Sequence, residues 1–138
     1  MENTIVITAL VNNTLKKTWE CYTQPQHITK WNFAIDEWQC PTATNELKVG
    51  GKYSARMEAK DGSFGFDFEA IYDEVEEYKK LAYTMLDGRK ATITFEQIDK
   101  HIKVEITFDA ESENPIEIQR DGWQAILNNF KKYTETLL

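Results

Sequence analysis

The sequence has few of the residue types on which most metal and redox chemistry depends. Its 138 residues include only two histidines and two cysteines, and Cys21 and Cys40 are not in C-x-x-C spacing. Without an H-E-x-x-H motif or clustered cysteines, we expect no metal site. Two isolated cysteines are typical of free thiols in a reducing compartment, which predicts a cytoplasmic protein.

Long apolar runs and positive charge are also scarce. No segment approaches the roughly 18 apolar residues of a membrane span, and the N-terminus lacks the basic-then-apolar pattern of a signal peptide. The chain has 16 Lys and Arg against 23 Asp and Glu, a net charge of −7. A surface with this balance repels phosphate backbones, so we expect neither a membrane span nor a nucleic-acid partner.

No catalytic constellation is recognisable. None of the three serines lies in a G-x-S-x-G elbow. The run Gly50-Gly51-Lys52 lacks the spacing of a phosphate loop, and a strand follows it. We therefore predict no catalytic residue and no cofactor. A general-acid pair among carboxylates such as Asp67 and Glu69 stays open, because buried carboxylates are recognised by their environment.

Length and composition fit one domain, residues 1–138, because the sequence has no repeat or linker. Residues 4–11 are rich in β-branched side chains and predict a buried strand. Asn13 or Thr14 is a candidate cap for a first short helix. Thr23 is a candidate cap for a second, with Pro25 in its first turn. Trp38 and the Cys40-Pro41 pair indicate a further strand or an extended loop.

A hairpin is predicted around Asp61-Gly62, which stands between two runs of alternating apolar and polar residues. A two-residue turn places Met57 opposite Phe66 and Ala55 opposite Phe68. Every apolar residue then meets another apolar residue on the same face.

A second hairpin is predicted with its turn at Asp99-Lys100, which places Phe95 opposite Val104. The strand over 81–85 fits this pattern only if the loop around Asp87-Gly88 has an odd length. We therefore predict a three-residue loop or a glycine bulge there. The result is an antiparallel meander of six to seven strands with one apolar face.

The segment after Asn114-Pro115 reads as one long helix to Leu138, with Asn114 as its cap. This helix must cover the apolar face of the sheet, which makes an α+β fold. A helix about 10 Å across does not fill the concave face of strands spaced about 4.8 Å apart, which favours a cavity. Gly122, beside Trp123, indicates either a close approach by another segment or a tolerated surface glycine.

Several short motifs carry a resemblance to a known family. They are Trp31-Asn32-Phe33, Gly50-Gly51-Lys52-Tyr53, the run 56–62, Phe68-Glu69-Ala70-Ile71-Tyr72 and the segment 119–133. With the order of predicted elements, they resemble the helix-grip fold of the START/birch-pollen-allergen (SRPBCC) superfamily. More narrowly, the sequence is similar to the activator of heat-shock-protein-90 ATPase family in a stand-alone form. The resemblance implies a curved antiparallel sheet wrapped around the long C-terminal helix.

The resemblance also implies a function, because members of the superfamily hold lipids, sterols, polyketides or other apolar molecules between sheet and helix. The positions expected to line such a site are Trp31, Phe33, Met57, Phe66, Phe68, Tyr83, Trp123, Leu127 and Phe130. Seven Phe, six Tyr and four Trp are enough to line a cavity. Plain core packing by the same side chains stays open as the alternative.

Three functions follow as hypotheses. The first is binding of a hydrophobic small molecule (a lipid, polyketide or aromatic). The second is a cyclase/aromatase-type enzyme that uses a buried Tyr or carboxylate. The third is a protein-interaction or co-chaperone-like stress-response module, with a protein partner or a homodimer. In eukaryotic chaperone activators the similar domain follows an additional N-terminal domain, and this sequence starts directly at its first predicted strand, so we do not expect chaperone activation.

Overall fold

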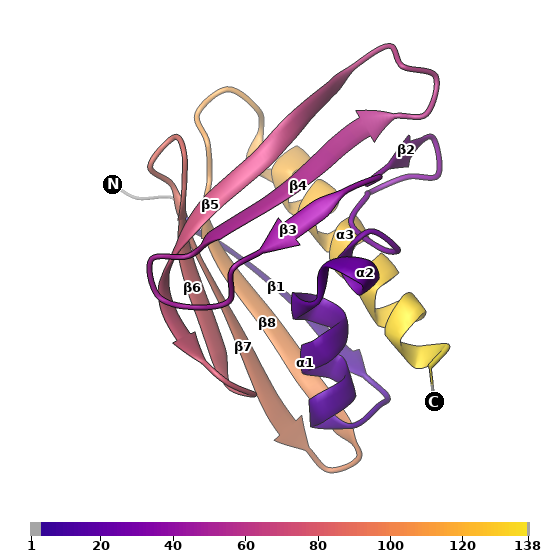
Figure 1. The fold of residues 1–138 in the computed structure, drawn as a ribbon, viewed down its shortest axis with the longest axis vertical. Coiled ribbons are helices and arrows are strands. Elements are labelled where there is room, and N and C mark those ends of the chain that lie inside the picture. Colours follow the sequence, from indigo (N-terminus) through magenta and orange to yellow (C-terminus); the bar gives the residue numbers. More distant parts are fainter. Residues whose placement is uncertain (1–3, 138) are drawn as a thin grey trace.

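The chain folds into a curled antiparallel sheet with a long helix against its concave side (Figure 1). The computed structural model describes residues 4–137. The strands are β1 (Thr4–Val11), β2 (Trp38–Gln39), β3 (Ala43–Asn45), β4 (Lys52–Ala59), β5 (Gly65–Glu76), β6 (Lys80–Met85), β7 (Lys90–Ile98) and β8 (His101–Asp109). The helices are α1 (Leu15–Thr23), α2 (Pro25–Ile28) and α3 (Ile116–Glu135).

The sheet has the strand order β1-β8-β7-β6-β5-β4-β2, and β3 also pairs with β4. This confirms the helix-grip fold, with two short helices after the first strand and the long helix at the C-terminus. Within residues 4–137 the sheet has eight strands, one more than the upper end of the expected six to seven. The short strands β2 and β3 share the outer edge of β4, and their irregular sequence carries no alternating pattern.

The predicted register of the hairpin β4–β5 is confirmed. Met57 pairs with Phe66, Ala55 with Phe68, and Arg56 with Asp67. Paired strand residues end at Glu58 and Gly65, so the connection is longer than the two-residue turn that the sequence suggests. The turn still centres on Asp61-Gly62, where Gly62 has a φ of +78°.

The odd-length loop between β6 and β7 is also confirmed. The backbone N–H of Met85 donates to the carbonyl of Arg89 at 2.7 Å, which leaves residues 86–88 as a three-residue loop. Gly88 in this loop has a φ of +92°. The next hairpin has Phe95 opposite Val104 and closes at the Ile98–His101 pair, as predicted.

The start of α3 differs from the prediction. Pro115 is the cap residue, and no side chain caps the helix there, so the assignment of Asn114 as cap was wrong. The side chain of Gln119 holds the entry instead. Its amide donates to the carbonyls of Glu111 at 3.1 Å and Asn114 at 2.8 Å. The helix ends at Glu135, and the predicted end at Leu138 lies outside the described residues.

Hydrogen bonds fasten α3 to the β1 edge of the sheet. The Gln124 side chain donates to the carbonyl of Thr8 at 3.1 Å. Just after β1, the side chain of Asn13 donates to the carbonyl of Thr134 at 2.9 Å. In Figure 1, α3 runs along the direction of β1, and its main packing against the sheet is with that strand. The helix therefore covers one end of the concave face.

Aromatic side chains fill the space between α3 and the short helices. Phe130 is fully buried, and its ring centroid lies 5.1 Å from those of both Tyr22 and Trp31. Cys21 and Cys40 are buried and unpaired. Within residues 4–137, no helix has the length and apolar content needed to cross a membrane.

Replacing Phe130 tests this aromatic cluster. Phe130→Ala removes a buried ring from a packed core, so we expect the free energy of unfolding to fall by about 3–5 kcal/mol. Ile118→Ala, on the exposed side of the same helix, should change it by less than about 0.5 kcal/mol. Urea unfolding followed by tryptophan fluorescence measures both, and equal effects would contradict the assigned packing.

The same substitution at two glycines should have opposite effects. A Cβ at Gly122 meets no atom within 4 Å, so Gly122→Ala should stabilise α3 by up to about 1 kcal/mol through helix propensity. Gly62 has a left-handed backbone at +78°, so Gly62→Ala should destabilise the protein by about 1–2 kcal/mol. Thermal and urea unfolding check both signs. A loss of stability in Gly122→Ala would show that another segment does approach this glycine.

Candidate functional site

Two adjoining chambers lie between α3 and the strands β4, β5 and β6. The outer chamber has a volume of about 370 Å³ and is lined by Phe33, Ala34, Ile35, Trp38, Met57, Phe66, Asn114, Ile118, Gln119, Gly122, Trp123 and Ile126. The inner chamber has about 240 Å³ and is lined by Tyr22, Trp31, Asn32, Tyr53, Met57, Phe66, Phe68, Tyr72, Tyr83, Arg89, Ile106, Trp123, Ile126 and Leu127. Met57, Phe66, Trp123 and Ile126 line both. The lining is mainly apolar and aromatic.

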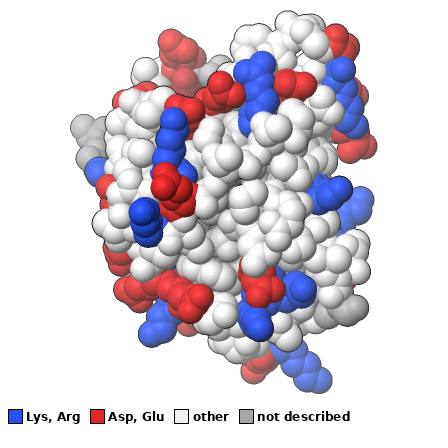
Figure 2. Space-filling view, in the orientation of Figure 1, with Lys and Arg blue, Asp and Glu red and all other residues white. Residues whose placement is uncertain are grey.

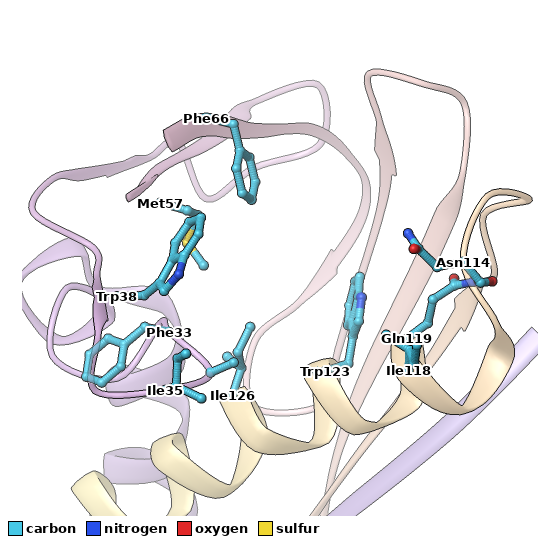
Figure 3. A pocket seen from close by; sticks show the side chains of 12 residues that line it. Phe33, Ile35, Trp38, Met57, Phe66, Asn114, Ile118, Gln119, Trp123 and Ile126 are labelled. Carbon is cyan, nitrogen blue, oxygen red and sulfur yellow. The ribbon is translucent and has the colours of Figure 1, made fainter. Parts of the chain in front are cut away.

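One face of α3 forms the floor of both chambers. Trp123 and Ile126 point from the helix toward Phe66 and Met57 on the opposite strands (Figure 3). One side of the Trp123 ring is stacked on Phe108, with centroids 3.8 Å apart and planes at 10°. This stacking fixes the indole, and the rest of its surface lines the cavity. Gly122 adds no side chain there, which leaves room in the outer chamber.

The segment between α2 and β2 forms a side wall, and hydrogen bonds hold it. The indole N–H of Trp31 donates to the carbonyl of Cys21 at 2.8 Å. The side-chain amide of Asn129, on α3, donates to the carbonyl of Phe33. These bonds place Trp31 in the inner chamber and Phe33 in the outer one, although the segment between them and β2 has no regular structure.

Four tyrosines surround the inner chamber. The hydroxyl of Tyr72 donates to the side-chain oxygen of Asn45 at 2.8 Å, and that of Tyr53 accepts from the Asn32 amide at 3.3 Å. Burial raises the pKa of Tyr72 to about 12. Burial, together with the neighbouring tyrosines, also raises the pKa of Tyr22 and Tyr53. These hydroxyls therefore stay protonated at neutral pH, and that of Tyr72 uses its proton in the bond to Asn45.

Acid–base groups are scarce around the chambers. Among the lining residues, all within 4–137, no histidine, aspartate or glutamate occurs, and Arg89 is the sole charged residue. Over the same described range, no cluster of three or more His, Cys, Asp or Glu could hold a metal ion. The site offers an apolar surface, tyrosine hydroxyls and one guanidinium.

Exposed apolar side chains surround the outer chamber. Ile35, Phe66 and Ile118 line it and are exposed, and Phe64 continues the patch through its contacts with Phe66 and Trp38. Figure 2 shows charged side chains mostly along the edges of the face in view, around a broad central area without them. An apolar rim of this kind marks a binding site more often than it does an ordinary protein surface.

The structure brings together most of the residues predicted from the sequence. Those that line a chamber are Trp31, Phe33, Met57, Phe66, Phe68, Tyr83, Trp123 and Leu127. Phe130 lines neither chamber and is fully buried in the core instead. It lies one helical turn beyond Ile126, where Tyr22 and Trp31 fill the space that the cavity occupies elsewhere.

Sequence reasoning missed other lining residues. Ile126 was available from helical spacing with Trp123, and Tyr53 and Tyr72 from the alternation along β4 and β5. Ile118 stands five residues before Trp123, which places it on another side of the helix, so this spacing gave no signal for it. Ile35 and Trp38 lie in the irregular segment before and in β2, where no period assigns a face. Arg89 could have been found from the odd loop, which sets it opposite Met85 on the inward face.

Solved structures support the fold. The chain is 36% identical to the AHSA1-like protein from Aeromonas hydrophila, with a TM-score of 0.92, covering 98% of this chain and 94% of that one. It is 43% identical to a protein from Cytophaga hutchinsonii, with a TM-score of 0.80 and coverage of 99% and 93%. A protein from Chromobacterium violaceum shares the fold at 20% identity, with a TM-score of 0.86, and the match covers 96% of this chain and 98% of that one.

Sequence comparison gives the family. A search of curated proteins finds no match to this chain. The family model described as Activator of Hsp90 ATPase homolog 1-like protein matches residues 12–135, nearly the whole chain. The protein therefore belongs to the family of Activator of Hsp90 ATPase homolog 1-like proteins.

Proposed function

We propose that the protein binds a hydrophobic small molecule, such as a lipid, a polyketide or an aromatic compound, in the two chambers between α3 and the sheet. The observation that carries the proposal is the shared wall of Met57, Phe66, Trp123 and Ile126, which joins an outer chamber of about 370 Å³ to an inner one of about 240 Å³. Ligand pockets of about 300–1,000 Å³ are typical for small molecules.

The lining supports affinity and orientation by different groups. Apolar and aromatic surface supplies affinity through burial of the ligand, at roughly 25 cal/mol per Å². Protonated hydroxyls such as that of Tyr83 supply a few directional contacts. The aromatic rings of the wall are held by stacking and by hydrogen bonds to the backbone, so little ordering is needed when a ligand enters.

The other two hypotheses have less support. A cyclase/aromatase-type enzyme would need an acid or base in the chambers, and in the described part of the chain only tyrosines with a raised pKa stand there. An interaction module would use the apolar rim at Phe64 and Ile118, without a need for the inner chamber. The two buried, unpaired cysteines support a cytoplasmic location within the same proposal.

Blocking the outer chamber tests the proposal. We expect wild-type protein to bind the neutral dye phenylnaphthylamine at one saturable site, with a blue-shifted fluorescence. Gly122→Phe places a ring in the outer chamber from a position with no neighbour within 4 Å. It should weaken dye binding by at least about tenfold, because it fills the space that the dye needs. Native mass spectrometry of the freshly purified protein adds a check for a co-purifying ligand.

Gly122→Ala is the matched control, since its methyl group leaves most of the chamber empty and should keep the wild-type affinity. Urea unfolding confirms that all three proteins are folded. If folded wild type takes up no dye at a saturable site, or if Gly122→Phe binds it unchanged, the chambers are not a binding site. Binding of a protein at the rim by both Gly122 variants alike would then favour the interaction hypothesis.

A further inference from the structure

The distribution of charge around the chambers is unusual for this protein. The chain has a net charge of −7, and carboxylates are abundant on its surface. Of the lining residues, all drawn from 4–137, the single charged one is nevertheless a cation, Arg89, in the inner chamber. A charge in an apolar site carries a desolvation cost and needs a compensating partner.

Local backbone geometry places Arg89 on the inward face. The three-residue loop 86–88 ends at Arg89, whose carbonyl accepts from the N–H of Met85. The next inward pairs along β6 and β7 are Tyr83 with Ala91 and Leu81 with Ile93, all buried. Arg89 thus continues a buried row of side chains, because alternate residues of a strand point to the same face.

The Arg89 guanidinium has only part of its hydrogen-bonding capacity occupied. Its Nε donates to Oδ2 of Asp87 at 2.7 Å, and the two side chains are 25% and 53% exposed. Over residues 4–137, no acceptor is found for its Nη1 and Nη2 nitrogens. Asp87 therefore satisfies one edge of the guanidinium from the solvent side, and the other N–H groups remain for a ligand.

A second donor stands in the same chamber. Tyr83 is 5% exposed and lines the inner chamber. Unlike Tyr53 and Tyr72, which are bonded to Asn32 and Asn45, its hydroxyl has no hydrogen-bond partner among the described residues. Burial raises the pKa of Tyr83, and Arg89 acts in the opposite direction, which is consistent with a guanidinium near the hydroxyl.

We propose that the ligand of these chambers is an apolar molecule with one anionic group, a carboxylate or a comparable oxyanion, which binds Arg89 and Tyr83 in the inner chamber. This rests on the proposed function and deepens it. The apolar body of the ligand extends past Trp123 and Met57 into the outer chamber. An oxyanion can accept hydrogen bonds from both the Arg89 guanidinium and the Tyr83 hydroxyl. The negative charge of the ligand is then paired with Arg89 and is not left alone in an apolar site.

Two dyes with the same aromatic frame test the proposal. Phenylnaphthylamine is neutral, and anilinonaphthalene sulfonate carries an anionic group on that frame. We expect wild type to bind the anionic dye about tenfold more tightly, the magnitude of one hydrogen-bonded charge. Arg89→Met should abolish this preference by weakening the anionic dye, and Arg89→Lys should restore part of it. Gly122→Phe, which blocks the outer chamber, should weaken the binding of both dyes, and this loss would show that both bind in the chambers.

Two further variants change the anion site without removing the arginine. Asp87→Asn frees the guanidinium from a competing carboxylate and should tighten binding of the anionic dye alone. Tyr83→Phe removes a donor at constant charge and should weaken the anionic dye several-fold, and more than the neutral dye. Added salt should weaken the anionic dye and spare the neutral one.

The outcomes separate the two proposals. If neither dye binds folded wild type at a saturable site, the proposed function itself fails. If the neutral dye binds but the anionic dye has no advantage, or if the advantage survives in Arg89→Met, the anion site is overturned and the apolar site stands. Urea unfolding monitors the fold of each variant. Should Arg89→Met not fold, Asp87→Asn and Tyr83→Phe decide, since unchanged anionic affinity in both would overturn the proposal.

Discussion

One helix is too narrow for the sheet that it has to cover, and the rest of the structure depends on this mismatch. Side-chain hydrogen bonds from Gln124 and Asn13 hold α3 at the β1 edge. The ring of Phe130, between Tyr22 and Trp31, fills the space under the short helices. Beyond this cluster, the chambers occupy the space between α3 and the strands β4, β5 and β6. The cavity is thus a consequence of where the helix is fastened.

The polar groups in this cavity differ in how they are satisfied. Asparagines bond the hydroxyls of Tyr53 and Tyr72, so these two tyrosines act as fixed parts of the wall. Asp87 occupies one of the five N–H donors of Arg89, its Nε–H, from the solvent side. Buried polar groups are normally paired within the protein. The Tyr83 hydroxyl lines the chamber without a partner among the described residues, so it indicates which chemistry a ligand can bring.

Much of the fold could be predicted because side chains alternate along a strand and because a loop must have an odd or an even length to keep the apolar residues of both strands on one face. Few strand registers satisfy both conditions. Pairing Met57 with Phe66 followed from a turn at Asp61-Gly62, and the odd loop before Arg89 followed from the need to keep apolar residues on one face. The site was harder to predict from the sequence. The apolar stripe of α3 contains both Phe130 and Trp123, and only the position of the helix on β1 decides which of them packs in the core and which faces the cavity. Ile35 lies in an irregular segment, where no helix or strand periodicity indicates which side chains face the cavity.

The wall shared by the two chambers has a thermodynamic consequence. Met57, Phe66, Trp123 and Ile126 belong to both, so each chamber takes its shape from the same four side chains. A molecule that shifts these side chains from the outer chamber also changes the volume and the contacts that the inner chamber offers. Occupancy of the two spaces is then linked. This linkage is reciprocal: if a molecule in the outer chamber changes the affinity of the inner chamber by some factor, a molecule in the inner chamber changes the affinity of the outer chamber by the same factor.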